Sequence, residues 1–138
     1  MRAYTDGSNI KDEAYSFACV IVDEETDTVI HTMSVKYEDE HKALRNVAGE
    51  VKGAIYALSY ALSNNYPAIE IRHDYTGVYH WAVKEWRAKQ PLPIMYQQIY
   101  AGVSDKLEVT FTKVKAHTGD KYNEMADQLA KEALGLKK

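Results

Sequence analysis

Alternating apolar and polar positions mark residues 1–6 and 28–37 near the start of the chain, and an apolar run between them covers residues 15–22. Over residues 28–37, positions 29, 31, 33, 35 and 37 share one side of the pleat, a period of two that is typical of a strand. Gly7 and the polar residues after it predict that the first strand ends at Asp6. Short polar turns join the segments, so this region predicts an antiparallel three-strand meander.

The pattern changes to a helical period over residues 44–62. Apolar residues recur there at intervals of three and four, and Asn64, Asn65 and Pro67 supply the stop signal. Residues 68–73 then predict a fourth strand, which is followed at once by Asp74. Strand, helix and strand form a crossover, so the fourth strand should run parallel to the first. If these strands are neighbours, Asp6 and Asp74 lie side by side.

The remaining sequence predicts three helices and a fifth strand. Helices are expected over residues 76–89 and 94–103, separated by Pro91 and Pro93, and a strand over residues 106–113. After a linker that contains Gly119, residues 121–134 predict a C-terminal helix with an apolar stripe. These elements indicate an α/β fold in which helices flank a mixed sheet.

Composition limits the class of protein. With 138 residues, 46% of them hydrophobic, the chain predicts a single domain over residues 1–138. Cys19 has no partner in the chain, which excludes an internal disulfide and predicts a core thiol in a reducing compartment. No apolar run approaches the ~20 residues of a membrane span, and no signal peptide is recognisable, so we expect a cytoplasmic protein without a membrane partner. The net charge of −3 gives no overall basic field for nucleic acid.

Four acids occupy positions that suggest a common site. Asp6 and Asp74 follow strands, whereas Glu50 and Asp127 border the apolar stripes of helices. Carboxylate clusters suit hard cations such as Mg²⁺ or Mn²⁺, and two such ions about 4 Å apart can activate water against a phosphodiester. Each acid also has a simpler interpretation: Asp6 as turn chemistry, Asp74 as a helix cap, Glu50 as a salt-bridged residue, and Asp127 as a partner of Lys131.

Four sequence blocks resemble type 1 ribonuclease H, in order along nearly the whole chain. They are YTDGS with Asp6, NVAGEVKGAIYAL with Glu50, IRHDYTGVYHW with Asp74, and KVKAHTGDKYNEMADQLAKEA with His117 and Asp127. The resemblance implies a ribonuclease H-like five-stranded mixed sheet flanked by helices. It also implies an endonuclease that uses two Mg²⁺ ions to cut the RNA strand of RNA/DNA hybrids, leaving 5′-phosphate and 3′-hydroxyl ends, with Mn²⁺ as a substitute.

The resemblance assigns roles by position. The four acids would be metal ligands and catalytic residues, with Asp6 bridging both ions, and His117 would assist proton transfer or product departure. Substrate contacts would come from polar and basic residues that also have plain interpretations as turn formers or helix caps: Ser8, Asn9, Arg45, Asn46, Thr76 and Asn123.

The chain also departs from the family pattern. Tyr75 replaces the usual serine after the third acid, Thr76 stands where a glutamine is frequent, and Arg45 and Val47 occupy positions of a DNA-phosphate pocket. The basic handle of some members is absent after Trp86, and the sequence starts at the first catalytic strand rather than with the N-terminal hybrid-binding domain of certain relatives. We therefore expect weak, salt-sensitive hybrid binding unless a partner or a further domain helps. We also expect a monomer. Two alternatives stay open: a superfamily nuclease acting on another nucleic acid, and a non-catalytic nucleic-acid-binding domain.

Overall fold

Five strands form one mixed sheet in the order β3-β2-β1-β4-β5. The computed structural model describes residues 1–114 and 120–136. The strands are β1 (Arg2–Ile10), β2 (Ala14–Asp23), β3 (Thr28–Tyr37), β4 (Ala68–His73) and β5 (Glu108–Lys113). β1, β2 and β3 pair antiparallel, whereas β4 pairs parallel to β1 and to β5. The predicted α/β fold with a meander and parallel strands is therefore confirmed.

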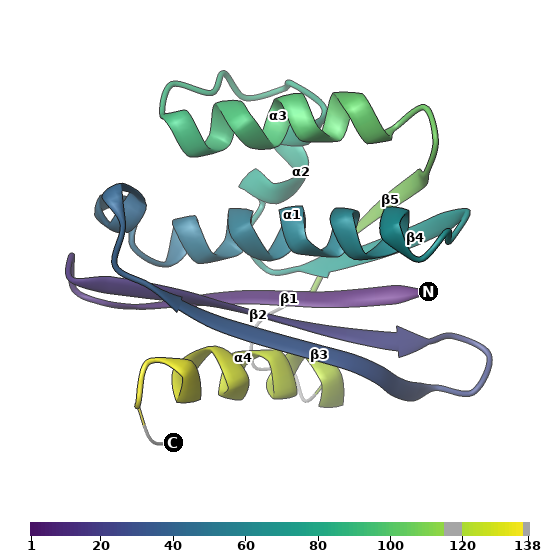
Figure 1. Cartoon of the computed structure of the whole chain (residues 1–138), viewed down its shortest axis with the longest axis horizontal. Coiled ribbons are helices and arrows are strands. Elements are labelled where there is room, and N and C mark those ends of the chain that lie inside the picture. The colour runs from purple at the N-terminus through teal and green to yellow at the C-terminus, as the bar shows by residue number, and fades with distance from the viewer. Residues whose placement is uncertain (115–119, 137–138) are drawn as a thin grey trace.

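Helices cover both faces of the sheet (Figure 1). After the short 3-10 helix η1 (Glu40–Leu44), α1 (Asn46–Ser63) lies on one face, and α2 (Gly77–Ala82) and α3 (Pro91–Val103) lie on the same side. The last helix, α4 (Lys121–Ala133), covers the opposite face. No helix in the described ranges is long and apolar enough to cross a membrane.

The strand β2 contributes side chains to two hydrophobic clusters, one on each face of the sheet. Alternate side chains such as Cys19 and Ile21 pack with α1, while Ala18 and Val20 belong to a smaller cluster with α4. Because both faces of this strand are covered, it appears in the sequence as a continuous apolar run rather than an alternating one. Cys19 is fully buried and free, as a core thiol should be.

Two predicted boundaries were wrong in ways that matter for the site. β1 continues to Ile10, so Asp6 lies within the strand opposite Ala18, and the turn is confined to the residues between Ile10 and Ala14. Gly7 does not break the strand because pairing with β2 continues through it. The helix expected over residues 76–89 is only α2, which ends before Lys84, a residue with φ of 64°.

Other boundaries shifted for local reasons. Arg45, with φ of 58°, separates η1 from α1, so the long helix begins at Asn46 rather than at residue 44. α3 begins at Pro91 because proline is compatible with the first turn of a helix.

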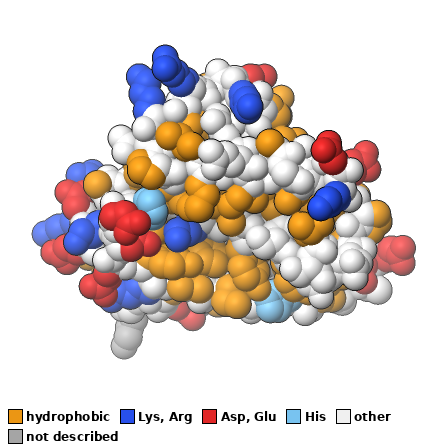
Figure 2. All heavy atoms as spheres, turned by 45° about the horizontal axis from the view of Figure 1, so that its top comes forward, with side chains coloured by type: hydrophobic (Ala, Val, Ile, Leu, Met, Phe, Trp, Pro, Cys, Tyr) orange, Lys and Arg blue, Asp and Glu red, His pale blue; other side chains and the backbone are white. Residues whose placement is uncertain are grey.

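The exposed surface carries apolar as well as charged groups. On the face shown in Figure 2, apolar side chains form a band across the middle, and basic side chains are scattered among acidic ones around it. That face shows no continuous basic surface.

Candidate functional site

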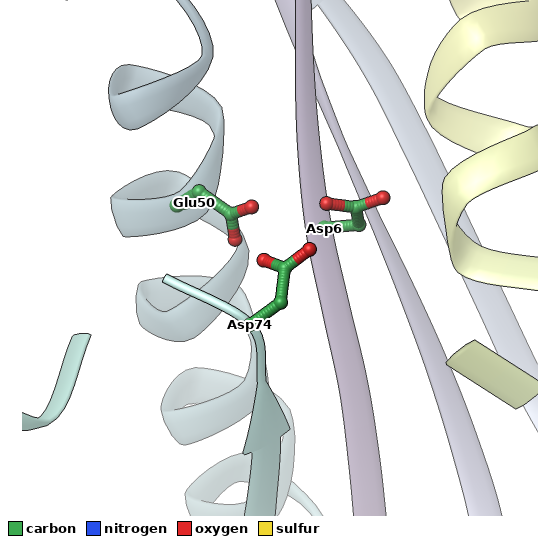
Figure 3. Close-up of side chains that lie close together, drawn as sticks. All are labelled: Asp6, Glu50 and Asp74. Carbon is green, nitrogen blue, oxygen red and sulfur yellow. The ribbon is translucent and has the colours of Figure 1, made fainter. Parts of the chain in front are cut away.

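Three carboxylates converge at the junction of three elements. Asp6 comes from β1, Glu50 from α1 and Asp74 from the residue after β4, and Figure 3 shows them facing one another. Each contributes one oxygen to a set whose atoms all lie within 4.8 Å of one another. Asp6 and Glu50 are buried, and Asp74 is half-buried.

The strand register brings Asp6 and Asp74 together. β1 and β4 pair in parallel, with Arg2 opposite Glu70 and Tyr4 opposite Arg72. Two residues further along the chain in each case, the same register leads to Asp6, within β1, and Asp74, directly after β4. The prediction that these acids lie side by side is confirmed, although the reason is the register and not a common strand end.

Two glycines bring Glu50 to the same place. A Cβ atom on Gly7 would clash with the Asn46 carbonyl oxygen and lie 2.6 Å from the Glu50 nitrogen, and one on Gly49 would clash with the Ser16 carbonyl oxygen. Only glycines at these two positions let α1 lie directly against β1 and β2. The close approach places the first turns of α1, and with them Glu50, over Asp6.

Hydrogen bonding at the cluster is incomplete. The backbone N–H of Gly7 donates to Asp6 Oδ1 at 2.9 Å and to Glu50 Oε1 at 3.2 Å. Glu50 Oε2 is buried and forms no hydrogen bond with any residue in the ranges 1–114 and 120–136. A buried carboxylate oxygen without a partner is costly, so the fold holds Glu50 in a position that a bound cation would satisfy.

The cluster is electrostatically unfavourable when it is fully charged. Burial, with the negative charges of Asp74 and Asp127 nearby, raises the pKa of Asp6 from 3.8 to about 7. Burial and the charges of Asp6 and Asp74 raise the pKa of Glu50 well above its usual value. Because a divalent cation would offset this repulsion and supply the missing partner, the residues fit a metal site for hard cations.

The fourth acid borders the same space without joining the cluster of three. Asp127, on α4, lines a cavity of about 560 Å³ together with Asp6, Glu50 and Asp74. Its Oδ2 accepts from Lys131 Nζ at 3.1 Å, which is the ion pair expected from the simpler interpretation of this residue. With Glu124, the cavity is lined by five acids and one lysine, Lys131.

Comparison with known proteins identifies the family. The sequence model of the RNase H family matches residues 1–135. This chain belongs to the RNase H family. Among curated RNase H relatives, the Ribonuclease H of Tropheryma whipplei (strain Twist) is 36% identical over 59 residues, which is 41% of this chain and 37% of the relative. The Ribonuclease H of Wolbachia pipientis wMel is 30% identical over 71 residues, or 49% of each chain. The matches thus span half or less of these relatives' lengths.

Solved structures extend the likeness of fold over almost the whole RNase H chain. RNase H1 from Halobacterium salinarum NRC-1 has a TM-score of 0.80 at 23% identity, covering 97% of this chain and 96% of that one. LC11-RNase H1, solved in complex with an RNA/DNA hybrid, has a TM-score of 0.77 at 19% identity, with coverage of 97% and 96%. At these identities the structures show a shared fold.

The structure places the expected RNase H substrate residues in two groups. Ser8, Asn9, Asn46 and Asn123 all line the cavity of the four acids. Arg45 and Thr76 do not: Arg45 is paired with Asp12 at 2.7 Å, and Thr76 lines a separate hollow. The expected catalytic His117 lies outside the described residues.

Sequence reasoning missed some contributors to the cavity. The Gly7 N–H, Tyr75 and Glu124 also form its wall or bond its acids. The signal for Gly7 was present, since a glycine follows Asp6 and another precedes Glu50. Its role was not recognised because a glycine after an acid is also ordinary turn chemistry.

Proposed function

We propose that this RNase H-family chain is an endonuclease that hydrolyses the RNA strand of RNA/DNA hybrids, leaving 5′-phosphate and 3′-hydroxyl ends. The observation that carries the proposal is the cluster of Asp6, Glu50 and Asp74, with oxygens within 4.8 Å and one buried oxygen of Glu50 unpartnered. Further support comes from relatives named Ribonuclease H and from a structural neighbour solved with an RNA/DNA hybrid.

The acids of the cavity would hold two Mg²⁺ ions, with Mn²⁺ as a substitute. Asp6 faces both Glu50 and Asp74 and is influenced by Asp127, so it is the acid best placed to serve both ions. Bound divalent cations supply Lewis-acid chemistry, which activates water and stabilises the leaving oxygen of a phosphodiester. With that chemistry supplied, no side chain has to act as a nucleophile.

The protein's own groups orient the ligands and the substrate. The Gly7 N–H fixes one oxygen each of Asp6 and Glu50, and Lys131 holds one oxygen of Asp127. Polar side chains on the cavity wall are suited to reading 2′-hydroxyl groups, which distinguish RNA from DNA. They are Ser8, Asn9, Asn46 and Asn123.

A cleavage assay tests the proposal. A labelled RNA/DNA hybrid, a DNA duplex and an RNA duplex are each incubated with the protein in Mg²⁺, in Mn²⁺ or in chelator. We expect only the RNA strand of the hybrid to be cut, only with metal, and the Asp6→Asn variant to lose at least ~99% of the activity because one ligand charge is removed. Asp105→Asn, at an exposed acid in a turn, is the matched control and should retain full activity.

Other outcomes would replace the proposal. Cleavage of a different duplex would indicate another nuclease of the superfamily. A folded protein that binds hybrid but cuts nothing would indicate a non-catalytic nucleic-acid-binding domain. Undiminished metal-dependent turnover by Asp6→Asn would remove Asp6 from its proposed role.

A further inference from the structure

A second hollow opens beside the carboxylate cavity, at the carboxyl ends of β4 and β5. It has a volume of about 210 Å³ and is lined by residues of β4, β5 and the start of α2: His73, Thr76, Tyr79, His80, Phe111 and Lys113. The carboxylate cavity does not share any of these side chains. We call this hollow the aromatic pocket.

We propose that the aromatic pocket binds one unpaired nucleotide, with its base between aromatic side chains and its phosphate near Lys113. This inference rests on the proposed function in one respect: the nucleotide would belong to a strand that is bound in the carboxylate cavity. The pocket itself is argued from its walls, its charge and its size.

The walls offer rigid aromatic faces. Tyr79 and Phe111 meet edge to face with ring centroids 5.6 Å apart, and Tyr79 remains 37% exposed. His80 is held by a stack on Trp86 at 4.8 Å and by a hydrogen bond of 2.7 Å to Glu85. Aromatic faces supported in this way bind nucleobases by stacking, with little dependence on sequence.

The polar groups suit a nucleotide rather than a purely apolar ligand. His73 is 2% exposed, and its ring is anchored through Nδ1, 3.0 Å from the carbonyl oxygen of Tyr75. The Thr76 hydroxyl adds a donor and acceptor, and Lys113 adds a positive charge that forms no ion pair with any described residue. None of the described lining residues is acidic, so the charge of the pocket favours a phosphate.

The size of the pocket limits the ligand. Its volume of about 210 Å³ is below the ~300–1,000 Å³ of typical small-molecule sites, so it accommodates one flat ring system and not a base pair. A paired base inside a hybrid is already stacked and cannot enter such a hollow without being unpaired. An unpaired nucleotide at a strand end is therefore the form that fits.

Its position links the pocket to the proposed substrate. Consecutive residues line the two sites in turn: Asp74 and Tyr75 line the carboxylate cavity, whereas His73 before them and Thr76 after them line the aromatic pocket. Tyr75 also contacts Trp86, the residue that stacks on His80. A strand leaving the carboxylates over Tyr75 therefore meets the aromatic pocket next.

Binding measurements with tailed and blunt hybrids test the inference. Anisotropy is measured in chelator for a blunt RNA/DNA hybrid and for four versions that each carry a two-nucleotide tail at a different strand end, with 2-aminopurine in the tail. We expect one tail to raise affinity about tenfold, as one stacked base allows, and its 2-aminopurine fluorescence to be quenched. Adenosine monophosphate and inorganic phosphate are titrated separately into the parent protein and into Tyr79→Leu, with chemical shifts of the Phe111 ring as the readout.

Matched variants assign any effect to the pocket. Tyr79→Leu removes an exposed aromatic wall and should abolish the gain from the tail, and Lys113→Gln should reduce it. Tyr66→Leu, at a half-buried tyrosine near another hollow, and Lys106→Gln, at an exposed lysine, are the controls and should preserve the gain. Thermal unfolding of each variant establishes that it is folded.

The outcomes separate this inference from the proposed function. A response to adenosine monophosphate alone, lost in Tyr79→Leu, would support a nucleotide pocket that serves free nucleotides. Equal affinity for blunt and all tailed hybrids, with no response to adenosine monophosphate, overturns the inference even if the blunt hybrid is cleaved. A gain that survives Tyr79→Leu also overturns it. Nucleotide binding without hybrid cleavage would leave the pocket intact and refute the proposed function.

Discussion

The carboxyl group of Asp6 is held in an environment that disfavours its own charge. It is 6% exposed, and its pKa of about 7 follows from burial beside other acids. In an unfolded chain the same group would titrate near 3.8. Between pH 3.8 and about pH 7 the folded protein binds more protons than the unfolded one, so the free energy of unfolding falls as the pH rises.

We predict that Asp6→Asn stabilises the metal-free protein at pH 8 and changes its stability little at pH 4. The cost of the charge is absent below about pH 4, grows as the pH rises and levels off near pH 7, at on the order of a few kcal/mol. Denaturant unfolding in chelator at both pH values measures the difference.

Asp105→Asn serves as the control for this measurement and should leave the stability unchanged at both pH values, because Asp105 is exposed. Addition of Mg²⁺ at pH 8 should reduce the advantage of Asp6→Asn, since a cation offsets the same repulsion in the parent protein. Equal stability of Asp6→Asn and the parent protein at pH 8 would show that Asp6 carries no such cost.

For His117 the prediction concerns rate alone. We expect His117→Ala to slow cleavage of the hybrid about 10- to 100-fold without abolishing it. The histidine would only assist proton transfer, whereas cations held by the carboxylates would supply most of the catalysis. Single-turnover rates in Mg²⁺ measure the effect, with His41→Ala as the control. Complete loss of cleavage would mean that His117 has a larger role than we assign to it.

The sequence predicted which acids form the site better than it predicted where the other side chains lie. Four acids were predicted to converge. Asp6, Glu50 and Asp74 do, because strand register and helix period place side chains in a regular way, whereas Asp127 only lines the same cavity. Arg45 and Thr76 were assigned by position in a resemblance, and they lie outside the cavity. Arg45 and Thr76 lie just outside a helix, where no repeating pattern of apolar positions indicates the direction of a side chain.

At the scale of elements, the contact between α1 and the sheet depends on glycine. The strand β1 was predicted to stop at Gly7, yet it runs on, and Gly7 is needed for the approach of α1. Single-sequence patterns recognise a glycine but do not tell whether it turns the chain or admits a neighbour. The same limit applies to Lys84, whose positive φ ends the second predicted helix without any glycine or proline.

We predict that Gly49→Ala destabilises the protein by about 3 kcal/mol or more, because the added methyl group meets the backbone of Ser16 and Gly7 rather than a flexible side chain. α1 would have to shift away from the sheet, so cleavage should fall as well. Chemical denaturation and the cleavage assay measure the two effects.

Gly102→Ala is the matched control for this substitution. It adds the same methyl group in α3, where nothing lies within 4 Å of the new Cβ. Its greater helix propensity should stabilise the protein by about 0.5–1 kcal/mol. Similar stabilities for the two variants would contradict the close-packed contact between α1 and the sheet.

At the scale of the whole molecule, the net charge should limit the strength of the proposed hybrid binding. The net charge is −3, and five acids line the proposed catalytic cavity. Basic side chains on the face shown in Figure 2 are dispersed among acids. Because the chain has no overall basic charge, we expect dissociation constants for the hybrid near 10⁻⁶ M or weaker at physiological salt, in the range of non-specific binding.

Arg45 provides the clearest test of this expectation. It is exposed at the start of α1 next to Asn46, and it pairs with the exposed Asp12, a contact that water and salt weaken readily. If Arg45 neutralises one of two or three bound phosphates, lowering salt from 200 to 50 mM should raise hybrid affinity roughly 10- to 40-fold. Arg45→Gln should reduce the slope of log affinity against log salt by about 1, whereas Lys106→Gln should leave it unchanged. Nanomolar affinity at physiological salt would contradict the expectation of weak binding, and an unaltered slope in Arg45→Gln would show that groups other than Arg45 neutralise the phosphates.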